Sequence, residues 1–319
     1  SEVESAARAG GLEVQPLQLR PHQRRRNAAE LAQLLQQNPV DLVNSQSSRD
    51  RAALAWLGVT GRLPVPLVVT RRQMPRTIAL ENWLVSRVAT RVVAVSRAVG
   101  EALVRRGTDR QKLVVIPNGL IASRVDLPVL PQELEQWRLR VGWEPSRRVV
   151  GIVSRTKDQA VILRALDQVT IPVRLVMVGV ERDGRLNRLA RQVPSRHAVV
   201  QLPFTSSVRP LYDLLELALL PSRSEGLSQA LLEAMALGKP VIASAATGNL
   251  DVITDGVDGM LVDPLNPVAW GRAIEQVLGD ASYAARSGEA ARRTARQTFA
   301  LEHTVQRTAR LYRSILRGD

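Results

Sequence analysis

A segment in the C-terminal half, residues 221–240, carries groups that suit the binding of an anion or a sugar. Its sequence is PSRSEGLSQALLEAMALGKP, and it directly follows the apolar run 217–220. Ser228 can cap the helix expected over 228–237, and Gly226 lets the backbone approach a ligand closely. Amides at a helix start favour an anion or a sugar oxygen, and Glu225 can accept hydrogen bonds from sugar hydroxyls.

Glu233 is the less expected residue of this segment. Its neighbours from Ala230 to Ala236 are all apolar, and an ionised carboxylate is costly to bury without partners. We therefore expect Glu233 to face either water or a donor group of a ligand. A solvent-facing glutamate on an amphipathic helix remains open, because the periodicity alone fits it as well.

A second candidate site lies at residues 151–158, GIVSRTKD, where an apolar strand ends in a polar turn. We expect a helix to start near Asp158. Cations at a helix start are repelled by the helix dipole, so Arg155 and Lys157 fit better with a phosphate bound beside them. The alternative is that both are solvated turn residues.

The N-terminal half offers polar strand ends and a basic cluster. Gln46 follows the strand expected over 40–44 and Arg72 follows the strand expected over 66–70, so both should face one cleft. Arg72 suits a phosphate or an anionic acceptor, with a solvated loop arginine as the alternative. The cluster before the helix at 27–37 suits anionic lipid or a phosphorylated acceptor, unless it is a solvated charge run: Arg20, Arg24, Arg25 and Arg26.

Length and composition exclude several classes of protein. A chain of 319 residues suggests two domains, and 45% apolar with 23% charged residues fits a well-packed soluble protein. Cysteine is absent, which excludes disulfides and zinc-thiolate sites. The net charge of +14 fits an anionic partner, but an aromatic content of 3% argues against nucleic acid as that partner. No secretory signal or membrane-spanning run is seen, so we expect a cytoplasmic protein, soluble or peripheral at the inner face of the membrane.

Short apolar runs alternate with amphipathic stretches, a pattern that predicts βαβ units and parallel sheets. The expected strands are 12–17, 40–44, 66–70, 91–95, 113–116, 148–153, 173–178, 197–200, 217–220, 240–243 and 259–262. The segments between the strands are expected to be helices, for example 27–37, 49–58, 78–88, 96–106, 158–168, 228–237 and 267–278, and further helices are expected over 131–140, 281–298 and 301–317. Because open α/β sheets bind ligands at the carboxyl ends of their strands, a cleft between two such sheets is the expected site.

Three segments together resemble family 4 glycosyltransferases with the GT-B fold. The pattern Pro-Ser-x-x-Glu-Gly-x-x-x-x-Leu-Leu-Glu-Ala-Met-Ala-x-Gly-x-Pro-Val at 221–241 is similar to the donor-site signature of that family, and TDGVDGMLVDP at 254–264 and PNG at 117–119 extend the match. The resemblance covers most of the chain from about residue 38 onward. It implies two Rossmann-like domains that face a cleft, residues 1–147 on the acceptor side and 148–298 on the donor side, with the helix in 299–319 packing back on the first domain.

The resemblance also assigns roles to residues. It implies that Glu225 contacts the transferred sugar, that Glu233 binds the nucleotide ribose, and that amides of Gly226, Leu227 and Ser228 hold the diphosphate. Arg155 and Lys157 would stabilise the diphosphate leaving group, although the loop between the family's two cations is shortened here. Three further positions border the donor pocket: Ser222 beside the glutamate loop, and Leu202 and Phe204 near the base, with packing in the core as the alternative for Phe204.

Two departures from the family pattern accompany the match. The first strand and its glycine-rich loop are not matched, because residues 1–11 resemble the end of a first helix and 12–17 the second strand. Where relatives place histidines near the donor sugar, this chain has Gln46 and Arg72, and its three histidines, His22, His197 and His303, lie elsewhere. A histidine general base is therefore not supported.

The resemblance implies a retaining, metal-independent transfer of sugar from a nucleotide-diphosphate sugar, such as a UDP or GDP sugar, to a lipid or saccharide acceptor, with no cofactor. An alternative is a protein with this fold that binds sugar nucleotides and transfers little or nothing. A sugar-nucleotide epimerase or a glycogen-phosphorylase-like enzyme is a third reading, which the residues expected in those clefts do not support.

Overall fold

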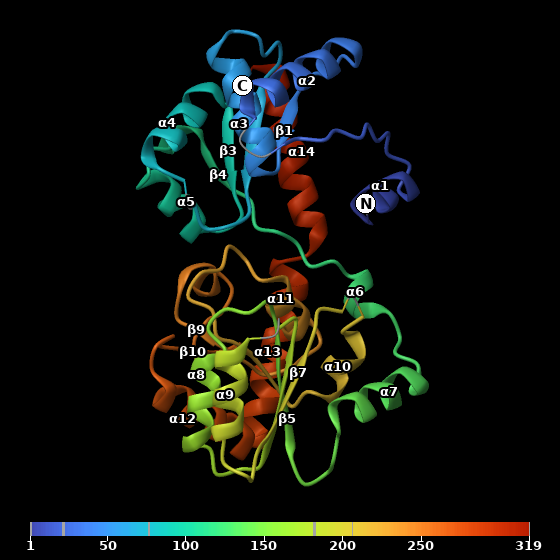
Figure 1. Ribbon diagram of the computed structural model, residues 1–319, viewed down its shortest axis with the longest axis vertical. Coiled ribbons are helices and arrows are strands. Elements are labelled where there is room, and N and C mark those ends of the chain that lie inside the picture. The colour runs from blue at the N-terminus through green and yellow to red at the C-terminus, as the bar shows by residue number, and fades with distance from the viewer. Residues whose placement is uncertain (1, 21–22, 76, 181–182, 206, 319) are drawn as a thin grey trace.

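The computed structural model describes residues 2–20, 23–75, 77–180, 183–205 and 207–318, which form two α/β domains stacked along the longest axis of the molecule (Figure 1). The predicted architecture of two parallel sheets is confirmed. The first domain has a four-stranded sheet of order β1-β2-β3-β4, and the second a six-stranded sheet of order β10-β9-β8-β5-β6-β7. All neighbouring strands are parallel.

The strands follow the predicted apolar runs closely. In the first sheet they are β1 (Val43–Ser45), β2 (Leu67–Arg71), β3 (Arg91–Ala94) and β4 (Leu113–Val115). In the second they are β5 (Arg148–Val153), β6 (Val173–Val178), β7 (Ala198–Leu202), β8 (Leu217–Leu220), β9 (Val241–Ser244) and β10 (Met260–Val262).

Fourteen α-helices are found in the described residues. In and after the first domain they are α1 (Glu2–Ala9), α2 (Arg24–Gln37), α3 (Ser48–Val59), α4 (Ala79–Val88), α5 (Arg97–Val104), α6 (Ser123–Asp126) and α7 (Pro131–Val141). The second domain contributes α8 (Ala160–Ala165), α9 (Gly184–Gln192), α10 (Arg209–Leu214), α11 (Gln229–Ala236), α12 (Pro267–Gly279), α13 (Ala281–Thr298) and α14 (Leu301–Arg317). Short 3₁₀ turns η1 (Arg110–Lys112), η2 (Leu166–Gln168) and η3 (Thr247–Asp251) complete the set.

The order of the second sheet creates a switch point that locates a ligand site. From β5 the chain proceeds to β6 and β7 on one side, and then returns to place β8 on the other side of β5, followed by β9 and β10. Ligands of such sheets bind in the crevice outside the carboxyl ends of the two strands where the order reverses. The loops after β5 and β8 are the two segments in which the sequence predicts phosphate and sugar chemistry.

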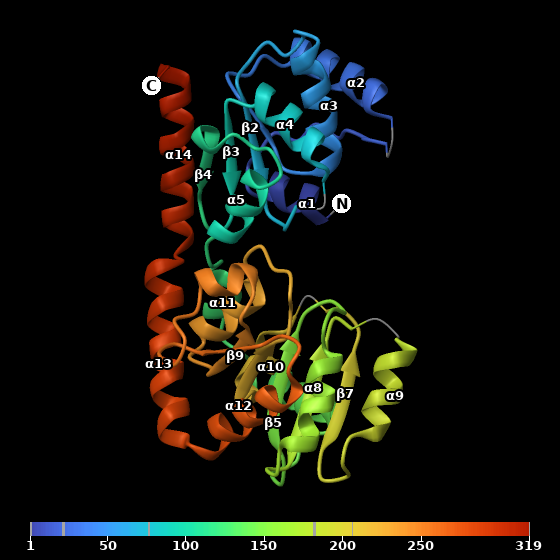
Figure 2. The same cartoon turned by 90° about the vertical axis from the view of Figure 1, so that its left-hand side faces the viewer.

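The chain crosses between the domains twice. Residues 116–130 lead from β4 into the second domain, and α14 returns to the first domain after α13 has packed along the second (Figure 2). Ile315 of α14 is buried with Val68, Val93 and Ile116 on one face of the first sheet, and Asn44 donates a hydrogen bond to the Tyr312 hydroxyl. The opposite face is covered by α3, α4 and α5, so α14 closes the second face of this sheet.

Some expectations are wrong in detail. Residues 12–17 form no strand, and Pro16 removes a backbone donor that a ladder would need. The helices α9 and α10 lie in segments between strands, which were expected to be helical, whereas the four-residue helix α6 was not expected, since so few residues give little periodicity. The helix expected from 158 begins at Ala160 and ends in η2.

Candidate active site at the switch point

The loops after β5 and β8 are joined by two charged pairs. Lys157 forms an ion pair with Glu225, and their side chains are 33% and 13% exposed. Arg223 Nε lies 2.9 Å from Asp158 Oδ1, and the Arg223 amide donates to Asp158 Oδ2 at 3.0 Å. The structure thus brings together the two segments that the sequence singled out separately, and it pairs a cation of one with a carboxylate of the other.

Gln159 shapes the turn after β5. It is fully buried, and its amide nitrogen donates to Ser154 Oγ at 3.1 Å and to the Arg155 carbonyl at 2.8 Å. Its amide oxygen accepts from the Lys157 backbone at 2.6 Å. Gln159, which the sequence analysis did not single out, therefore fixes the turn. Arg155 itself is exposed.

The glutamate loop is pressed between a 3₁₀ turn and the first domain. The Glu225 amide donates to Thr247 Oγ1 at 2.9 Å, and the Gly248 amide donates to the Glu225 carbonyl at 3.2 Å. A Cβ on Gly226 would overlap the carbonyl oxygen of Arg72 in the first domain, and one on Gly248 would overlap the Gly226 carbonyl. Thr247 holds a φ of +47°, a strained conformation for a β-branched residue. The lobes touch backbone to backbone beside the Lys157–Glu225 pair.

A second contact ties the domains together beside this one. Arg97 Nε lies 2.8 Å from Asp251 Oδ1, and the Ala98 amide donates to Asp251 Oδ2 at 3.2 Å. Asp251 ends η3 and thereby caps the start of α5 in the first domain. A carboxylate is favourable at a helix start, so this contact is complementary in charge.

Glu233 does not face water. Its side chain is 9% exposed and faces protein donors, with Arg124 Nη1 at 3.4 Å and the Tyr212 hydroxyl at 3.3 Å. Burial raises the pKa of Glu233, and Arg124 and Tyr212 oppose that shift. The pKa of Tyr212 lies well above its ordinary value, again through burial first and then the Glu233 charge. Because Arg124 belongs to the interdomain segment, Glu233 connects the donor helix α11 to that segment.

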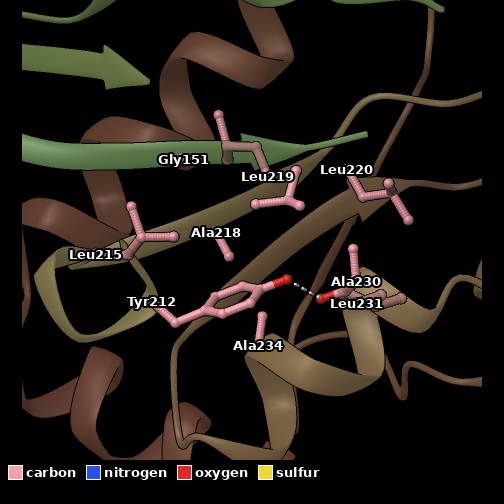
Figure 3. Close-up of a pocket in the computed structure, with 10 residues that line it drawn as sticks. Gly151, Tyr212, Leu215, Ala218, Leu219, Leu220, Ala230, Leu231 and Ala234 are labelled. Carbon is pink, nitrogen blue, oxygen red and sulfur yellow. Dashed lines mark hydrogen bonds between the residues drawn. The ribbon is translucent and has the colours of Figure 1, made fainter. Parts of the chain in front are cut away.

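A small cavity beside Tyr212 is not the ligand site. Figure 3 shows Tyr212 pointing toward the Ala230 carbonyl, to which its hydroxyl donates at 3.2 Å. The cavity measures about 10 Å³, and Gly151, Leu215 and Leu231 are among its mostly apolar walls. That volume is at the lower limit for one water molecule, so the cavity is a packing gap between the sheet and α10 and α11.

The other predicted residues have varied environments. Ser228 accepts a hydrogen bond from the Leu231 amide at 3.4 Å, which confirms its capping role. Ser222 is 1% exposed, and its Oγ has no hydrogen-bond partner among the described residues. Leu227 is buried and Leu202 partly buried, whereas Phe204 is 79% exposed, so packing in the core does not explain Phe204. Gln46 and Arg72 both have exposed side chains at strand ends of the first sheet.

Neither of the two described histidines, His197 and His303, takes part in this crevice. His197 is buried, its Nδ1 accepts from the Val173 amide at 3.1 Å, and its Nε2 lies 3.1 Å from the carbonyls of Leu166 and Val169. Burial lowers the pKa of His197, which fits a neutral structural residue. His303 is exposed near Pro117, and His22 lies outside the described residues.

The described residues also bear on metal binding and on membrane insertion. Within the described ranges, no group of three or more histidine, aspartate or glutamate side chains is placed to hold a metal ion. None of the described helices is long and apolar enough to cross a membrane.

Comparison with known proteins agrees with this geometry. A family model for Glycosyl transferases group 1 matches residues 146–294, and a model for Glycosyltransferase Family 4 matches residues 2–124. An uncharacterized glycosyltransferase, MJ1607, of Methanocaldococcus jannaschii is 27% identical over 75% of this chain and 63% of its own length. The lipopolysaccharide core biosynthesis mannosyltransferase LpcC of Rhizobium leguminosarum is 29% identical over 81% of this chain and 73% of its own.

A D-inositol 3-phosphate glycosyltransferase of Xylanimonas cellulosilytica is 31% identical over 65% of this chain, and the match spans about half, 52%, of that relative. Among solved structures, Anabaena HepE in complex with UDP superposes with a TM-score of 0.84 at 22% identity, covering 98% of this chain and 89% of the other. Sucrose-phosphate synthase of Thermosynechococcus elongatus gives a TM-score of 0.75 at 20% identity, covering 96% and 83%. The two family models, the switch-point site and the two-sheet fold place this chain among the family 4-like glycosyltransferases of the GT-B fold.

Proposed function

We propose that this protein transfers a sugar from a nucleotide-diphosphate sugar to a lipid or saccharide acceptor, with retention at the anomeric carbon and without a metal ion. The observation that carries the proposal is the Lys157–Glu225 pair at the carboxyl ends of β5 and β8. The mannosyltransferase and inositol-phosphate relatives and the UDP-bound HepE structure support the reaction class.

In the proposed reaction, residues of the second domain bind the charged diphosphate. Lys157 would leave Glu225 to neutralise the departing diphosphate, and amides of Gly226 to Ser228 would donate to its oxygens, as preorganised donors do at a developing negative charge. Glu225, released from Lys157, would accept hydrogen bonds from the sugar hydroxyls. The C1–diphosphate bond breaks, a bond from C1 to the acceptor oxygen forms, and the acceptor proton passes to the departing diphosphate.

The remaining residues would position the donor. Arg155 is exposed beside the turn and can reach a phosphate, and the exposed ring of Phe204 can stack on the nucleotide base. Glu233 accepts from Arg124 through Oε1 and from Tyr212 through Oε2, and the second lone pair of each oxygen would accept from the ribose hydroxyls. We place Gln46 and Arg72 on the acceptor side.

The first test is a thermal-shift panel of UDP-, GDP- and ADP-sugars with the purified chain. A ligand at 100 times its dissociation constant adds about 2.7 kcal/mol of stability. Lys157→Ala and Glu225→Gln should weaken the response to the preferred nucleotide about tenfold or more, since charged hydrogen bonds contribute about 1.5–3 kcal/mol. Arg188→Ala, an exposed change on α9, is the matched control. No response to any nucleotide would contradict the proposal.

Turnover distinguishes the transferase from a binding protein of the same fold, the candidate favoured because neither described histidine, His197 or His303, lies in the crevice. Release of the nucleoside diphosphate should require an acceptor and should fall about 10²–10³-fold in Lys157→Ala, as for loss of one oxyanion donor. Nucleotide binding without any turnover across lipid and saccharide acceptors would favour the binding protein.

A further inference from the structure

A large groove lies on the first domain, between α2, α3 and α4, on the side of the sheet away from α14 (Figure 2). Its volume is about 1030 Å³, at the upper end of the range for small-molecule sites. Nothing in the crevice at β5 and β8 contributes to it. Two features, an apolar wall and a cationic end, indicate what it binds.

The wall of the groove is apolar and partly exposed. Ala55, Trp56 and Leu84 line it, and at its margin Ile78 and Leu80 are 69% and 59% exposed. A second hollow of about 520 Å³ shares Val59 and Leu84 with the groove and so extends it along α3 and α4. A surface of this kind suits a flexible hydrocarbon chain, because burying apolar area is favourable without fixed geometry.

The other end of the groove is cationic. Among the described residues, one carboxylate, Glu81, and four arginines line it: Arg20, Arg24, Arg49 and Arg51. The guanidinium carbons of Arg24 and Arg25 lie 5.3 and 5.2 Å from the centroid of the Trp56 ring, which lines the groove, so both exposed arginines lie over that ring. The Asn27 side chain is buried and bonds the Arg20 amide and carbonyl at 3.0 and 2.8 Å, which fixes the segment before α2.

Arg51 adds a nearly buried cation to this end. Its side chain is 8% exposed, Nη1 donates to the Ser47 carbonyl at 3.4 Å, and Nη2 lies 3.6 Å from Glu81 Oε1. Its Nε is buried and has no partner among the described residues, as is also true of Arg174 in the second domain. Arg71 behind it has its pKa lowered to about 10, by burial first and then by the charge of Arg51. Positive charge is therefore in excess where an acidic head group would lie.

We infer that this groove binds an acidic phospholipid of a membrane, with an acyl chain along α3 and α4 and the phosphate among Arg20, Arg24, Arg49 and Arg51. A chain with one anionic end matches the groove in both charge and polarity. Free phosphate would leave the apolar wall uncovered, and an uncharged lipid would leave the arginines without an anion. The inference does not depend on the proposed sugar transfer, because it concerns a different face of the molecule.

Vesicle co-sedimentation of the full chain tests the cationic end. The chain should sediment with vesicles of phosphatidylcholine and phosphatidylglycerol and not with phosphatidylcholine alone. Arg24→Glu/Arg25→Glu should weaken the partitioning at least about tenfold, given about 1 kcal/mol per arginine near an anionic surface. Arg188→Glu/Arg191→Glu on α9 carries the same change in net charge at exposed positions of the other domain and should bind nearly as the wild type.

A second pair of variants tests the apolar wall. Ile78→Ser/Leu80→Ser removes two exposed side chains from the groove margin and should also weaken partitioning about tenfold, since each apolar side chain buried in lipid contributes about 1–2 kcal/mol. Val257→Ser/Leu265→Ser makes the same change at exposed positions of the second domain, 58% and 68% exposed, and serves as control. The single change Arg49→Glu repeats the charge test at an exposed position away from Trp56.

The outcomes separate the inference from its competitors. Equal sedimentation of wild type, Arg24→Glu/Arg25→Glu and Arg49→Glu would overturn it, as would loss in the α9 control alone. If the arginine variants fall but Ile78→Ser/Leu80→Ser binds as the wild type, the attraction is to surface charge only and no chain enters the groove. The UDP-sugar thermal shift measured on the same variants reports whether they are folded and whether the donor site is unaffected.

Discussion

The crevice of the second domain and the α2–α3–α4 groove of the first differ in how their charges are arranged. At the crevice two cations face carboxylates, Lys157 with Glu225 and Arg223 with Asp158, while Arg155 is exposed. In the first domain, the arginines of the α2–α3–α4 groove outnumber the carboxylates that line it, and Arg51 keeps a buried nitrogen without a partner.

This difference predicts two ways of binding an anion. A paired cation binds a phosphate only by leaving its carboxylate, so the donor crevice exchanges one ion pair for another and the carboxylate becomes free for sugar hydroxyls. An unpaired cation gains a partner without losing one, so the groove should hold its anion with no such exchange. Paired cations suit a substrate whose product must leave, and cations in excess suit a ligand that stays bound.

The largest effect is expected from disturbing the close backbone contact between Gly226 in the second domain and the Arg72 carbonyl in the first domain. Gly226→Ala places a methyl group against the Arg72 carbonyl and Val95. Overpacking of this kind costs about 1–3 kcal/mol of unfolding free energy. Because a displacement of about 1 Å at a site can cost about 10²-fold, turnover should fall further than stability.

Two measurements check this expectation: kcat with the preferred donor and urea unfolding. Gly184→Ala at the start of α9 is the matched control, since no heavy atom lies within 4 Å of the Cβ it would add. A Gly226→Ala enzyme with wild-type kcat would show that the lobes do not need this contact for the reaction.

An intermediate effect is expected at Glu233, a buried carboxylate of the second domain. Burial raises its pKa above the ordinary 4.5, against the opposing effects of Arg124 and Tyr212. A carboxyl group whose folded pKa is raised stabilises the fold below its unfolded pKa and loses that contribution as pH rises through the folded pKa. Glu233→Gln has no such titration, so its unfolding free energy relative to the wild type should rise between acidic and neutral pH.

Thermal unfolding of Glu233→Gln and wild type across pH 4 to 7 measures this difference. Glu101→Gln, an exposed change on α5, controls for loss of one surface charge. A difference between Glu233→Gln and wild type that stays constant over this range, or that falls toward neutral pH, would contradict the raised pKa. A stability difference that changes with pH in Glu233→Gln and stays constant in Glu101→Gln would separate the buried carboxylate from an exposed one.

The sequence predicts the sheets better than the site. Strands buried on both faces read as continuous apolar runs, such as 217–220 and 148–153, and both lie where they were expected. Residues 12–17 alternate apolar and polar side chains over their first four positions, as half-buried strands do, but whether they pair depends on a neighbouring strand that local sequence does not describe. The cap at Ser228 was predictable because its partner, the Leu231 amide, is three residues away.

The residues that were missed act over long separations. Arg124 reaches Glu233 across 109 residues and Tyr212 reaches it across 21, so neither could be read from the helix that carries the glutamate. Gln159 fixes the turn of Lys157 through three hydrogen bonds, yet a glutamine after a strand carries no distinctive pattern. Excess charge in the groove likewise depends on three helices meeting, which the periodicity of each one separately does not indicate.

The smallest effect is expected at the exposed pair that joins the domains, Arg97 with Asp251. Arg97 is 75% exposed, so Arg97→Ala should cost about 0.2–1 kcal/mol, the usual range for surface ion pairs, and the cost should shrink as salt is raised. Asp251 is only 14% exposed and also accepts from the Ala98 amide at the start of α5. Asp251→Ala should therefore cost more, about 1 kcal/mol or above, and lose less of that cost in salt, because a cap is a hydrogen bond as well as a charge. Urea unfolding of both variants at low and high salt gives the two costs. Equal losses of unfolding free energy with equal salt dependence would mean that the cap adds nothing to the ion pair. The contact of Asp251 with α5 would then depend on its charge interaction with Arg97 alone.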